Sequence, residues 1–132
     1  LDFIASGPGY PAPDLALELS RQQVAPGGWV EGRVTASAAR HLALLTVDAD
    51  GRVRRLGPAA LTRVGAAWLI RFPAPADGPL LLVAIGADAP LDTPSRLDGA
   101  GAGRFFDALA REAAQRDLPL TRDIARLGIA PP

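Results

Sequence analysis

The stretch Leu42–Leu56 (LALLTVDADGRVRRL) constrains the fold of this chain most. Side chains alternate across a strand, and both alternating sets of Leu42–Val47 are apolar, which is typical of a central strand covered on both faces. The letters DADG place Asp and Gly at the first and fourth positions of a type I turn. A three-residue loop with Gly51 at positive φ sets Val47 opposite Val53. The stretch therefore predicts a bulged β-hairpin on which the rest of the chain packs.

Four further segments carry strand patterns of hydrophobicity. Leu15–Leu19, Trp29–Ala36 and Ala67–Phe72 alternate apolar with polar or small residues, which indicates half-buried strands. Leu80–Ala87 (LLLVAIGA) is a continuous apolar run of strand length, the pattern of a strand buried on both faces. Ala59–Val64 has no clear pattern, and we predict a loop there.

The last third of the chain holds the clearest helical pattern. Arg104–Arg116 has apolar residues at four-residue spacing and charged residues on the other side, which predicts an amphipathic helix. The preceding segment, Ala89–Gly103, is rich in Pro, Asp, Ser and Gly and predicts a surface loop. Pro119–Ile129 fits two structures: a short helix ended by Gly128, or a closing strand.

The chain is long enough for one domain with a substantial core, since it has 132 residues. Residues 1–13 contain three prolines and two glycines and predict an extended linker. Pro26-Gly27 fits the central pair of a type II turn. For residues 14–132 the short strands favour a single, mainly β domain. We expect an antiparallel β-sandwich of immunoglobulin-like or similar topology, with the C-terminal helix packed at an edge.

Composition excludes several classes of protein. The 14 basic residues are all Arg and are balanced by 14 acidic residues, so a dedicated nucleic-acid binder, which carries a basic face, is not expected. There is no cysteine, which rules out disulfides and thiolate sites. No apolar run approaches the roughly 20 residues that span a bilayer, so we expect no membrane insertion by this chain.

Three motifs could carry chemistry, and each has a simpler structural interpretation. Asp48 and Asp50 resemble part of a calcium loop, but Arg residues stand where further ligands belong, so a hairpin turn is favoured. The glycines of segment 98–103 lack the spacing of a phosphate-binding loop and predict a flexible start of the helix. His41, the only histidine, has no nucleophile that the sequence selects, Ser37 included. We therefore expect no metal, no cofactor and no enzymatic activity.

The candidate binding residues are basic or aromatic. Arg52, Arg54 and Arg55 form a basic patch beside the hairpin, which could meet an acidic partner or a phosphate, or could be a solvated strand face. Trp29 and Trp68 could line a ligand groove, although large aromatic residues of a small β domain more often belong to its core.

A series of motifs follows in order between Leu15 and Asp92. A strand leads to a Pro-Gly-Gly turn and a second strand, followed by HLALLTVDADGRVRRLGP, by RFPAP, and by a buried strand that ends near Leu-Asp. In this order they resemble the bacterial domain-of-unknown-function family 4384. The chain departs from the family at Gly57-Pro58-Ala59, where members have a Pro-Asn pair. The resemblance implies an accessory β-sandwich with no catalytic residues, and it favours a strand within 119–129.

Members of that family look like modules appended to kinases, caspase-like peptidases or envelope-associated proteins. We therefore expect a non-catalytic accessory or regulatory interaction module of a larger bacterial protein. Its partner would be another domain of the parent protein or a separate protein, and a periplasmic location is favoured. The first residue, Leu1, is not Met, which suggests a fragment of that larger protein. The alternatives are a glycan- or peptide-binding sandwich that uses Trp29, Tyr10 or Trp68, and a hydrolase that uses His41.

Overall fold

The computed structural model describes residues 15–21, 23–36, 41–65, 67–74 and 79–129. The linker expected in residues 1–13, which includes Tyr10, lies outside these residues, as does Ser37. The described elements, in chain order, are β1 (Leu15–Leu19), β2 (Gln23–Val24), β3 (Trp29–Ala36), β4 (His41–Val47), β5 (Val53–Arg55), the 3₁₀ turn η2 (Pro58–Ala60), β6 (Leu61–Val64), β7 (Ala67–Pro73), β8 (Leu80–Ala87), α2 (Thr93–Arg96), α3 (Ala102–Gln115) and β9 (Thr121–Ile129).

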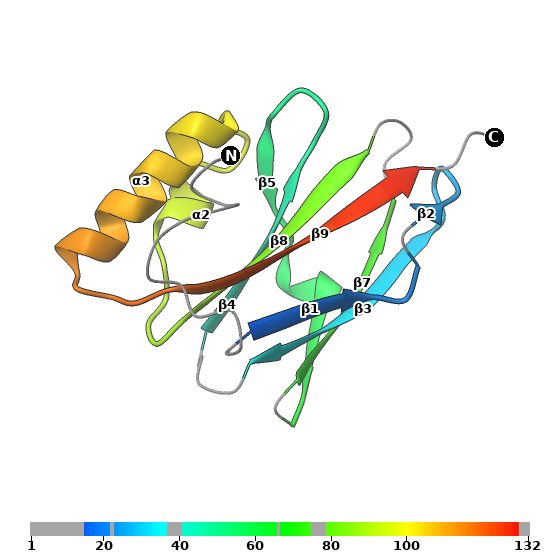
Figure 1. Cartoon of the computed structure of the whole chain (residues 1–132), viewed down its shortest axis with the longest axis horizontal. Helices are drawn as coiled ribbons and strands as arrows, with labels where there is room; N and C mark the ends of the chain where they lie inside the picture. The colour runs from blue at the N-terminus through cyan, green and yellow to red at the C-terminus, as the bar shows by residue number, and fades with distance from the viewer. Residues whose placement is uncertain (1–14, 22, 37–40, 66, 75–78, 130–132) are drawn as a thin grey trace.

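The strands form two sheets that pack face to face. One sheet has four antiparallel strands in the order β1-β3-β7-β6, and the other has five in the order β2-β9-β8-β4-β5. All neighbours in the five-stranded sheet are antiparallel except β2, which runs parallel to the end of β9. Figure 1 shows both helices on the side of the molecule away from β3 and β7. The predicted mainly β, sandwich-like fold is confirmed.

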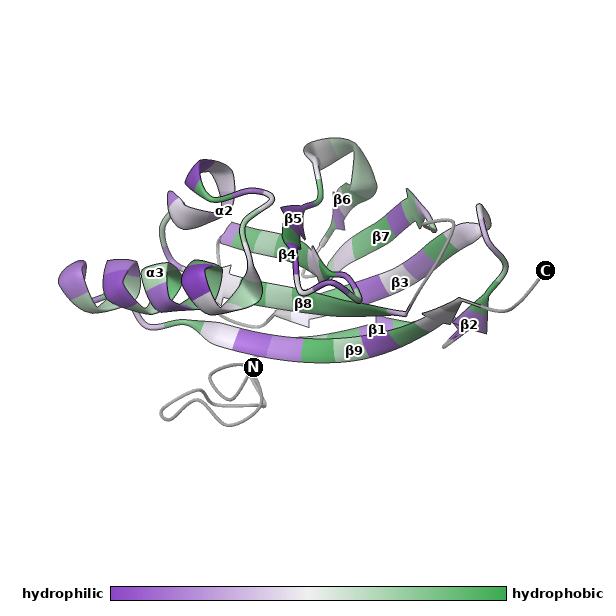
Figure 2. Cartoon of the chain, turned by 90° about the horizontal axis from the view of Figure 1, so that it is seen from above, coloured by the Kyte–Doolittle hydropathy of each residue, from purple (hydrophilic) through white to green (hydrophobic). Residues whose placement is uncertain are grey.

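The core between the sheets is built from the inward faces of their central strands. Trp68, Ile70 and Phe72 of β7 are buried there, which confirms the predicted phase of this strand. Leu44 of β4 and Leu82 of β8 meet them from the five-stranded sheet. Figure 2 shows β3 and β7 striped with hydrophilic and hydrophobic residues, as expected when only one face of a sheet is buried.

A second core lies on the outer face of the five-stranded sheet. Phe105 and Leu109 of α3 are fully buried against Leu45, Val83 and Ile85 of that sheet. The prediction of a helix at an edge of the sandwich is therefore wrong in this detail, because α3 covers a face. The physical reason is the sequence of β4 and β8: both strands are apolar on both sides, so each side needs a cover.

The hairpin has the predicted register and turn. Val47 is paired with Val53, and Gly51 has a φ of 80°. The Asp48 carboxylate accepts hydrogen bonds from the backbone amides of Asp50 (3.0 Å) and Arg52 (2.9 Å), which fixes the loop. The type II turn is also confirmed, since Gly27 has a φ of 71° and the amide of Gly28 donates to the carbonyl of Ala25 (2.9 Å).

Three segments differ from the sequence prediction. Residues 61–64 form the strand β6 rather than a loop, and α3 begins at Ala102, two residues earlier than expected. The segment Ala89–Gly103 is not a free loop, because it contains α2 and its residues 99–101 pair with β5. For the ambiguous Pro119–Ile129 the strand is confirmed as β9, and the helical alternative is wrong.

Candidate interaction surfaces

The outer face of the four-stranded sheet, here called the open face, carries three large apolar side chains that are exposed. Large apolar side chains that are exposed in the described part of the chain are Trp29 (52%), Val64 (55%) and Leu69 (47%). They come from β3, β6 and β7, and strand alternation places all three on the side opposite the buried Val30 and Ile70. The core interpretation of the two tryptophans is therefore wrong for Trp29, which is exposed, and confirmed for Trp68.

Charged residues of both signs share the open face with these apolar side chains. Glu31 stands opposite Arg71 in the β3–β7 register, and Glu18 forms an exposed ion pair with Arg33 (3.4 Å). The Arg71 guanidinium lies 4.1 Å from the centre of the Trp29 ring, within the range of a cation–π contact. Acidic and basic side chains are therefore paired across this face, so the face carries no strong net charge.

A shallow groove runs beside Trp29 at the end of this sheet. It has a volume of about 230 Å³, and its lining includes Ser20, Arg21, Val24 and Glu31 as well as Trp29. The aromatic ring is thus flanked by an acid, a base and a hydroxyl. The other tryptophan, Trp68, is buried in the core and has the Arg63 guanidinium 4.7 Å from its ring centre, so it lines no exposed groove.

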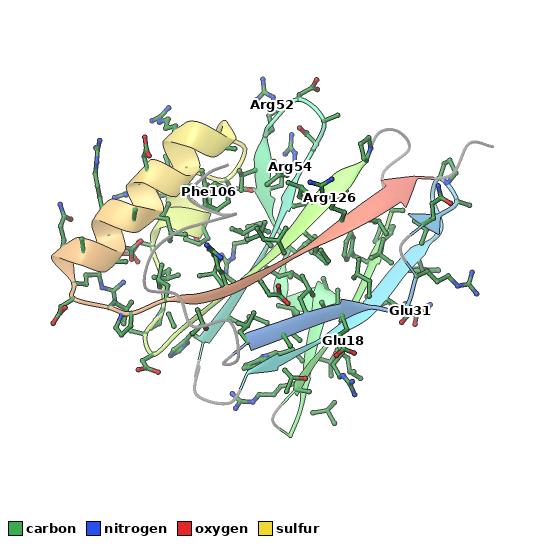
Figure 3. The ribbon with its side chains drawn as sticks, viewed as in Figure 1. Glu18, Glu31, Arg52, Arg54, Phe106 and Arg126 are labelled. Carbon is green, nitrogen blue, oxygen red and sulfur yellow. The ribbon has the colours of Figure 1, made fainter. Side chains whose placement is uncertain are left out.

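The three hairpin arginines do not form one patch. The Arg52 guanidinium donates to the carbonyl of Gly99 (3.3 Å), and the Arg55 guanidinium donates to the hydroxyl of Ser95 (2.6 Å). Arg54 alternates with Arg55 and lies opposite Thr46, so its side chain leaves the other face of β5. Figure 3 shows Arg52 and Arg54 at the hairpin, at the other end of the view from Glu18 and Glu31.

The backbone edge of β5 is also occupied. The amide of Val53 donates to the carbonyl of Ala100 (2.8 Å), and the amide of Gly99 donates to the carbonyl of Val53 (2.7 Å). The Asp98 carboxylate accepts from the amide of Arg55 (2.8 Å). The glycine-rich segment is therefore an edge cover rather than the flexible helix start that its composition predicts.

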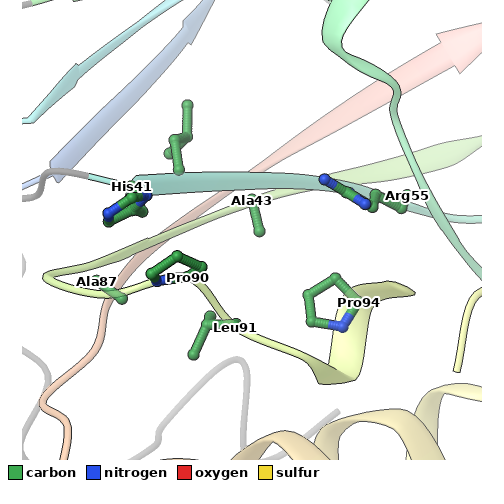
Figure 4. A pocket seen from close by; sticks show the side chains of 8 residues that line it. His41, Ala43, Arg55, Ala87, Pro90, Leu91 and Pro94 are labelled. Atoms are coloured by element: carbon green, nitrogen blue, oxygen red, sulfur yellow. The ribbon is translucent and has the colours of Figure 1, made fainter. Parts of the chain in front are cut away.

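A small pocket lies between β4 and the segment that follows β8. Figure 4 shows His41 and Arg55 at its two ends, with Ala43, Ala87, Pro90, Leu91 and Pro94 around it. Its volume is about 130 Å³. The described lining supplies no carboxylate and no Ser or Thr hydroxyl to His41, and Ser37 lies outside the described residues. This lining therefore provides no nucleophile or acid for the catalytic alternative at His41.

The described acidic residues do not gather into a metal site. Within the described ranges no group of three or more His, Asp or Glu side chains comes together in a way that could hold a metal ion. At the hairpin the Asp48 carboxylate is engaged by two backbone amides, as a turn residue would be. The calcium interpretation of this loop therefore has no ligand set among these residues.

Two acidic residues that the sequence did not single out hold elements together. Glu112 of α3 is buried and accepts hydrogen bonds from the amides of Asp92 and Thr93, from the Thr93 hydroxyl and from Arg116. Burial raises the pKa of the Glu112 carboxyl, but these hydrogen bonds outweigh it and hold the pKa at about 2. Asp123 of β9 accepts from the amide of Leu17 in β1 (2.8 Å) and so bridges the two sheets.

Comparison of the chain with protein-family models, with curated proteins and with solved structures gives no match. Among the described residues there is also no helix with the length and apolar character needed to cross a membrane.

Proposed function

We propose that this domain is a non-catalytic interaction module that binds a protein partner through the open face of its four-stranded sheet. The observation that carries the proposal is the position of the exposed apolar side chains. Trp29, Val64 and Leu69, which are the large apolar side chains exposed among the described residues, all belong to this face. The other outer face of the sandwich lies under α3.

The composition of the open face suits a protein interface. Aromatic residues and Arg are enriched at the centres of interfaces, and a Trp that becomes buried on binding is a frequent hot spot. Trp29 and Arg71 already stack on each other, so the ring is held in place before a partner arrives. The cross-strand charges, Glu31 with Arg71 and Glu18 with Arg33, would select a partner with matching charges and fix its register.

The partner that we propose is another domain of the parent protein or a protein that acts with it. Support comes from the resemblance to the accessory family 4384, whose members are appended modules, and from the balanced charge, which disfavours nucleic acid. The bacterial, regulatory and periplasmic parts of this assignment rest on the resemblance alone.

The test is a binding experiment with the remaining domains of the parent protein. We expect amide chemical-shift changes of the ¹⁵N-labelled domain to map to β3, β6 and β7. The double variant Trp29→Ser/Leu69→Ser should weaken binding by about 30-fold or more, since a hot-spot residue contributes about 2 kcal/mol or more. The matched control is Asp107→Ser/Arg111→Ser on the exposed side of α3, which should bind like the parent chain. Equal loss in both double variants, or shifts confined to α3, would exclude the open face.

A second candidate function is glycan binding in the groove beside Trp29. The supporting observation is a half-exposed indole flanked by Glu31, Ser20 and Arg21, because sugars stack on aromatic rings and bind polar groups at the edge. Titration of tryptophan fluorescence with a panel of oligosaccharides is the test, since buried Trp68 provides an unchanged background. Saturable quenching that is lost in Trp29→Ala and retained in Trp29→Phe supports this function. A flat titration across the panel rules it out for the sugars used.

A further inference from the structure

We propose a second site, separate from the open face: the pocket between β4 and the segment after β8 binds the C-terminal end of an extended peptide whose last side chain is apolar. The lining includes His41, Arg55 and Leu91 (Figure 4). Neither the open face nor the groove beside Trp29 contributes to this pocket. The inference goes beyond the proposed function, and each can fail without the other.

Among the described residues, a short length of the β4 edge beside the pocket is not covered by another strand. The amide of Leu56 donates to the carbonyl of Leu44 (2.9 Å), so the backbone groups of Leu44 point toward β5. Backbone groups two residues apart in a strand point the same way, so those of Leu42 point to this side too. β5 pairs with β4 only from Leu45 onward. Within the described residues the outward N–H and C=O of Leu42 therefore meet no partner, and an added strand can pair with them.

The pocket next to that edge combines polar surface with apolar side chains, since every lining residue except His41 and Arg55 is apolar. Leu42 lines the pocket although its side chain packs against the core between the sheets, so it contributes its main chain. The remaining apolar lining comes from Ala43, Leu91 and Pro94, among others. The volume of about 130 Å³ has room for one aliphatic side chain.

The Arg55 guanidinium suits an anionic group at one end of the pocket. His41 and Arg55 stand at the two ends of the pocket, and no acidic residue is part of its described lining. The Arg55 guanidinium donates one hydrogen bond to the Ser95 hydroxyl (2.6 Å), which orients it and leaves further N–H donors. A carboxylate is the group that such a fork of donors fits best.

The strand order explains why the carboxylate belongs to a chain end. The position beside Leu44 is already taken by Leu56, so a peptide that pairs with Leu42 reaches the end of β5 and cannot continue in line. Arg55 belongs to that end of β5. A peptide that runs parallel to β4 places its terminal carboxylate there, beside the guanidinium, and its last side chain beside the pocket. An N-terminal ammonium group at the same place would be repelled.

The probes for the test are acetylated pentapeptides of sequence Ser-Thr-Ser-Thr-X, where X is Ala, Val, Leu or Ile, each with a free and with an amidated C-terminus. We expect the free-acid peptides with X as Val or Leu to shift the amide resonances of Leu42, Ala43 and Leu91. Amidation should weaken binding by about tenfold or more, the scale of one charge-assisted hydrogen bond. Acetate alone should not reproduce the shifts of Ala43 and Leu91.

Four variants separate the parts of the site. Ala43→Leu fills the pocket and should abolish binding, and Arg55→Gln should weaken the free-acid peptides to the level of the amides. Arg54→Gln, on the other face of the same strand, should bind normally. Ser95→Ala removes the bond that orients Arg55 but keeps the cation, so it should weaken binding less than Arg55→Gln does. Melting temperatures measured for each variant show that the fold is retained.

Either of two results overturns the proposal, and a third assigns the peptide elsewhere. One is equal affinity for the acid and amide forms of every peptide. The other is the absence of shifts at Leu42 and Ala43 for all four free-acid peptides at millimolar concentration. Shifts that map to β1 or β6 instead would assign the peptide to a different edge and would also exclude this pocket.

Discussion

Replacing Glu112 with Gln should remove a pH-dependent clamp between α3 and α2. The carboxylate accepts hydrogen bonds from the amides of Asp92 (2.9 Å) and Thr93 (2.9 Å), from the Thr93 hydroxyl (2.7 Å) and from the Arg116 guanidinium (2.6 Å). It does so at the start of α2, where the side chain of Asp92 makes no capping bond. A Gln side chain has one acceptor oxygen and turns its own N–H donors toward these donors.

The magnitude follows from the lowered pKa of Glu112. This pKa is about 2 in the folded chain, against an ordinary value of 4.5, and each unit corresponds to about 1.4 kcal/mol. The charged form therefore stabilises the fold by about 3 kcal/mol. Because the pKa is lowered by folding, this stability is fully present above about pH 4.5 and is lost as the pH falls toward about 2. Glu112→Gln should cost about 2–3 kcal/mol at neutral pH, and less as the pH falls.

The assay is urea unfolding of both proteins at constant ionic strength, from about pH 7 to about pH 2.5, followed by circular dichroism. The difference between their free energies of unfolding should shrink by at least half across the lower part of this range. Asp107→Asn, an exposed carboxylate of the same helix, serves as the control and should show little difference at any pH. A Glu112→Gln difference that stays constant with pH, or that is below about 1 kcal/mol at neutral pH, would refute the clamp.

Three further predictions concern packing and turns. Trp68→Ala should lower the free energy of unfolding by about 3–5 kcal/mol, because this side chain is only 7% exposed; an unchanged denaturation midpoint would mean that the strand phase is wrong. Gly51→Val should cost about 1–3 kcal/mol, since a β-branched residue resists a φ of 80°, and thermal unfolding measures it. In Gly32→Ala the new Cβ would lie 2.5 Å from the carbonyl oxygen of Glu18, so the free energy of unfolding measured in urea should fall by about 1–3 kcal/mol. Gly103→Ala is the control: it has open space around it and should be neutral or stabilising by up to about 1 kcal/mol.

The parts of the fold that the sequence predicts are those with local causes. The hairpin register follows from turn chemistry at Asp48 and Gly51, and the phase of β7 follows from alternation over seven residues. The doubly apolar patterns of β4 and β8 indicate that both faces are covered. They do not identify the cover, and so the helix could be predicted while its place on the outer face could not.

The segments that sequence analysis missed are set by long-range pairing. Residues 89–103 have the composition of a loop, but their backbone pairs with β5, which lies more than 40 positions earlier in the chain. β6 has four residues, too few for alternation to be distinguished from chance. β2 has two residues, and it exists because the end of β9 offers a free edge.

The candidate sites also depend partly on local sequence patterns and partly on long-range contacts. Trp29 shares its strand phase with Glu31 and Arg33, so its exposure could be inferred from alternation within β3. The partners of Arg52 and Arg55 are separated from them by 47 and 40 positions, so nothing near the hairpin predicts that both side chains are engaged. The pocket beside His41 depends on the path of residues 87–94 across β4, which no local pattern encodes.

Most edges of the two sheets are already covered, so we propose that partners bind the open face or the short free edge at Leu42. The edge of β5 is paired with residues 99–101, and the outward amide of Leu17 in β1 is taken by Asp123, while β6 is kept short. Access to the outer face of the five-stranded sheet would require α3 to leave, which would expose Phe105 and the strand residues beneath it. Burial of one such side chain is worth about 1.5–3 kcal/mol, so a partner that displaced the helix would have to replace several of them. The open face and the free backbone of Leu42 require no such rearrangement, and a partner that uses either can bind the folded domain as it stands.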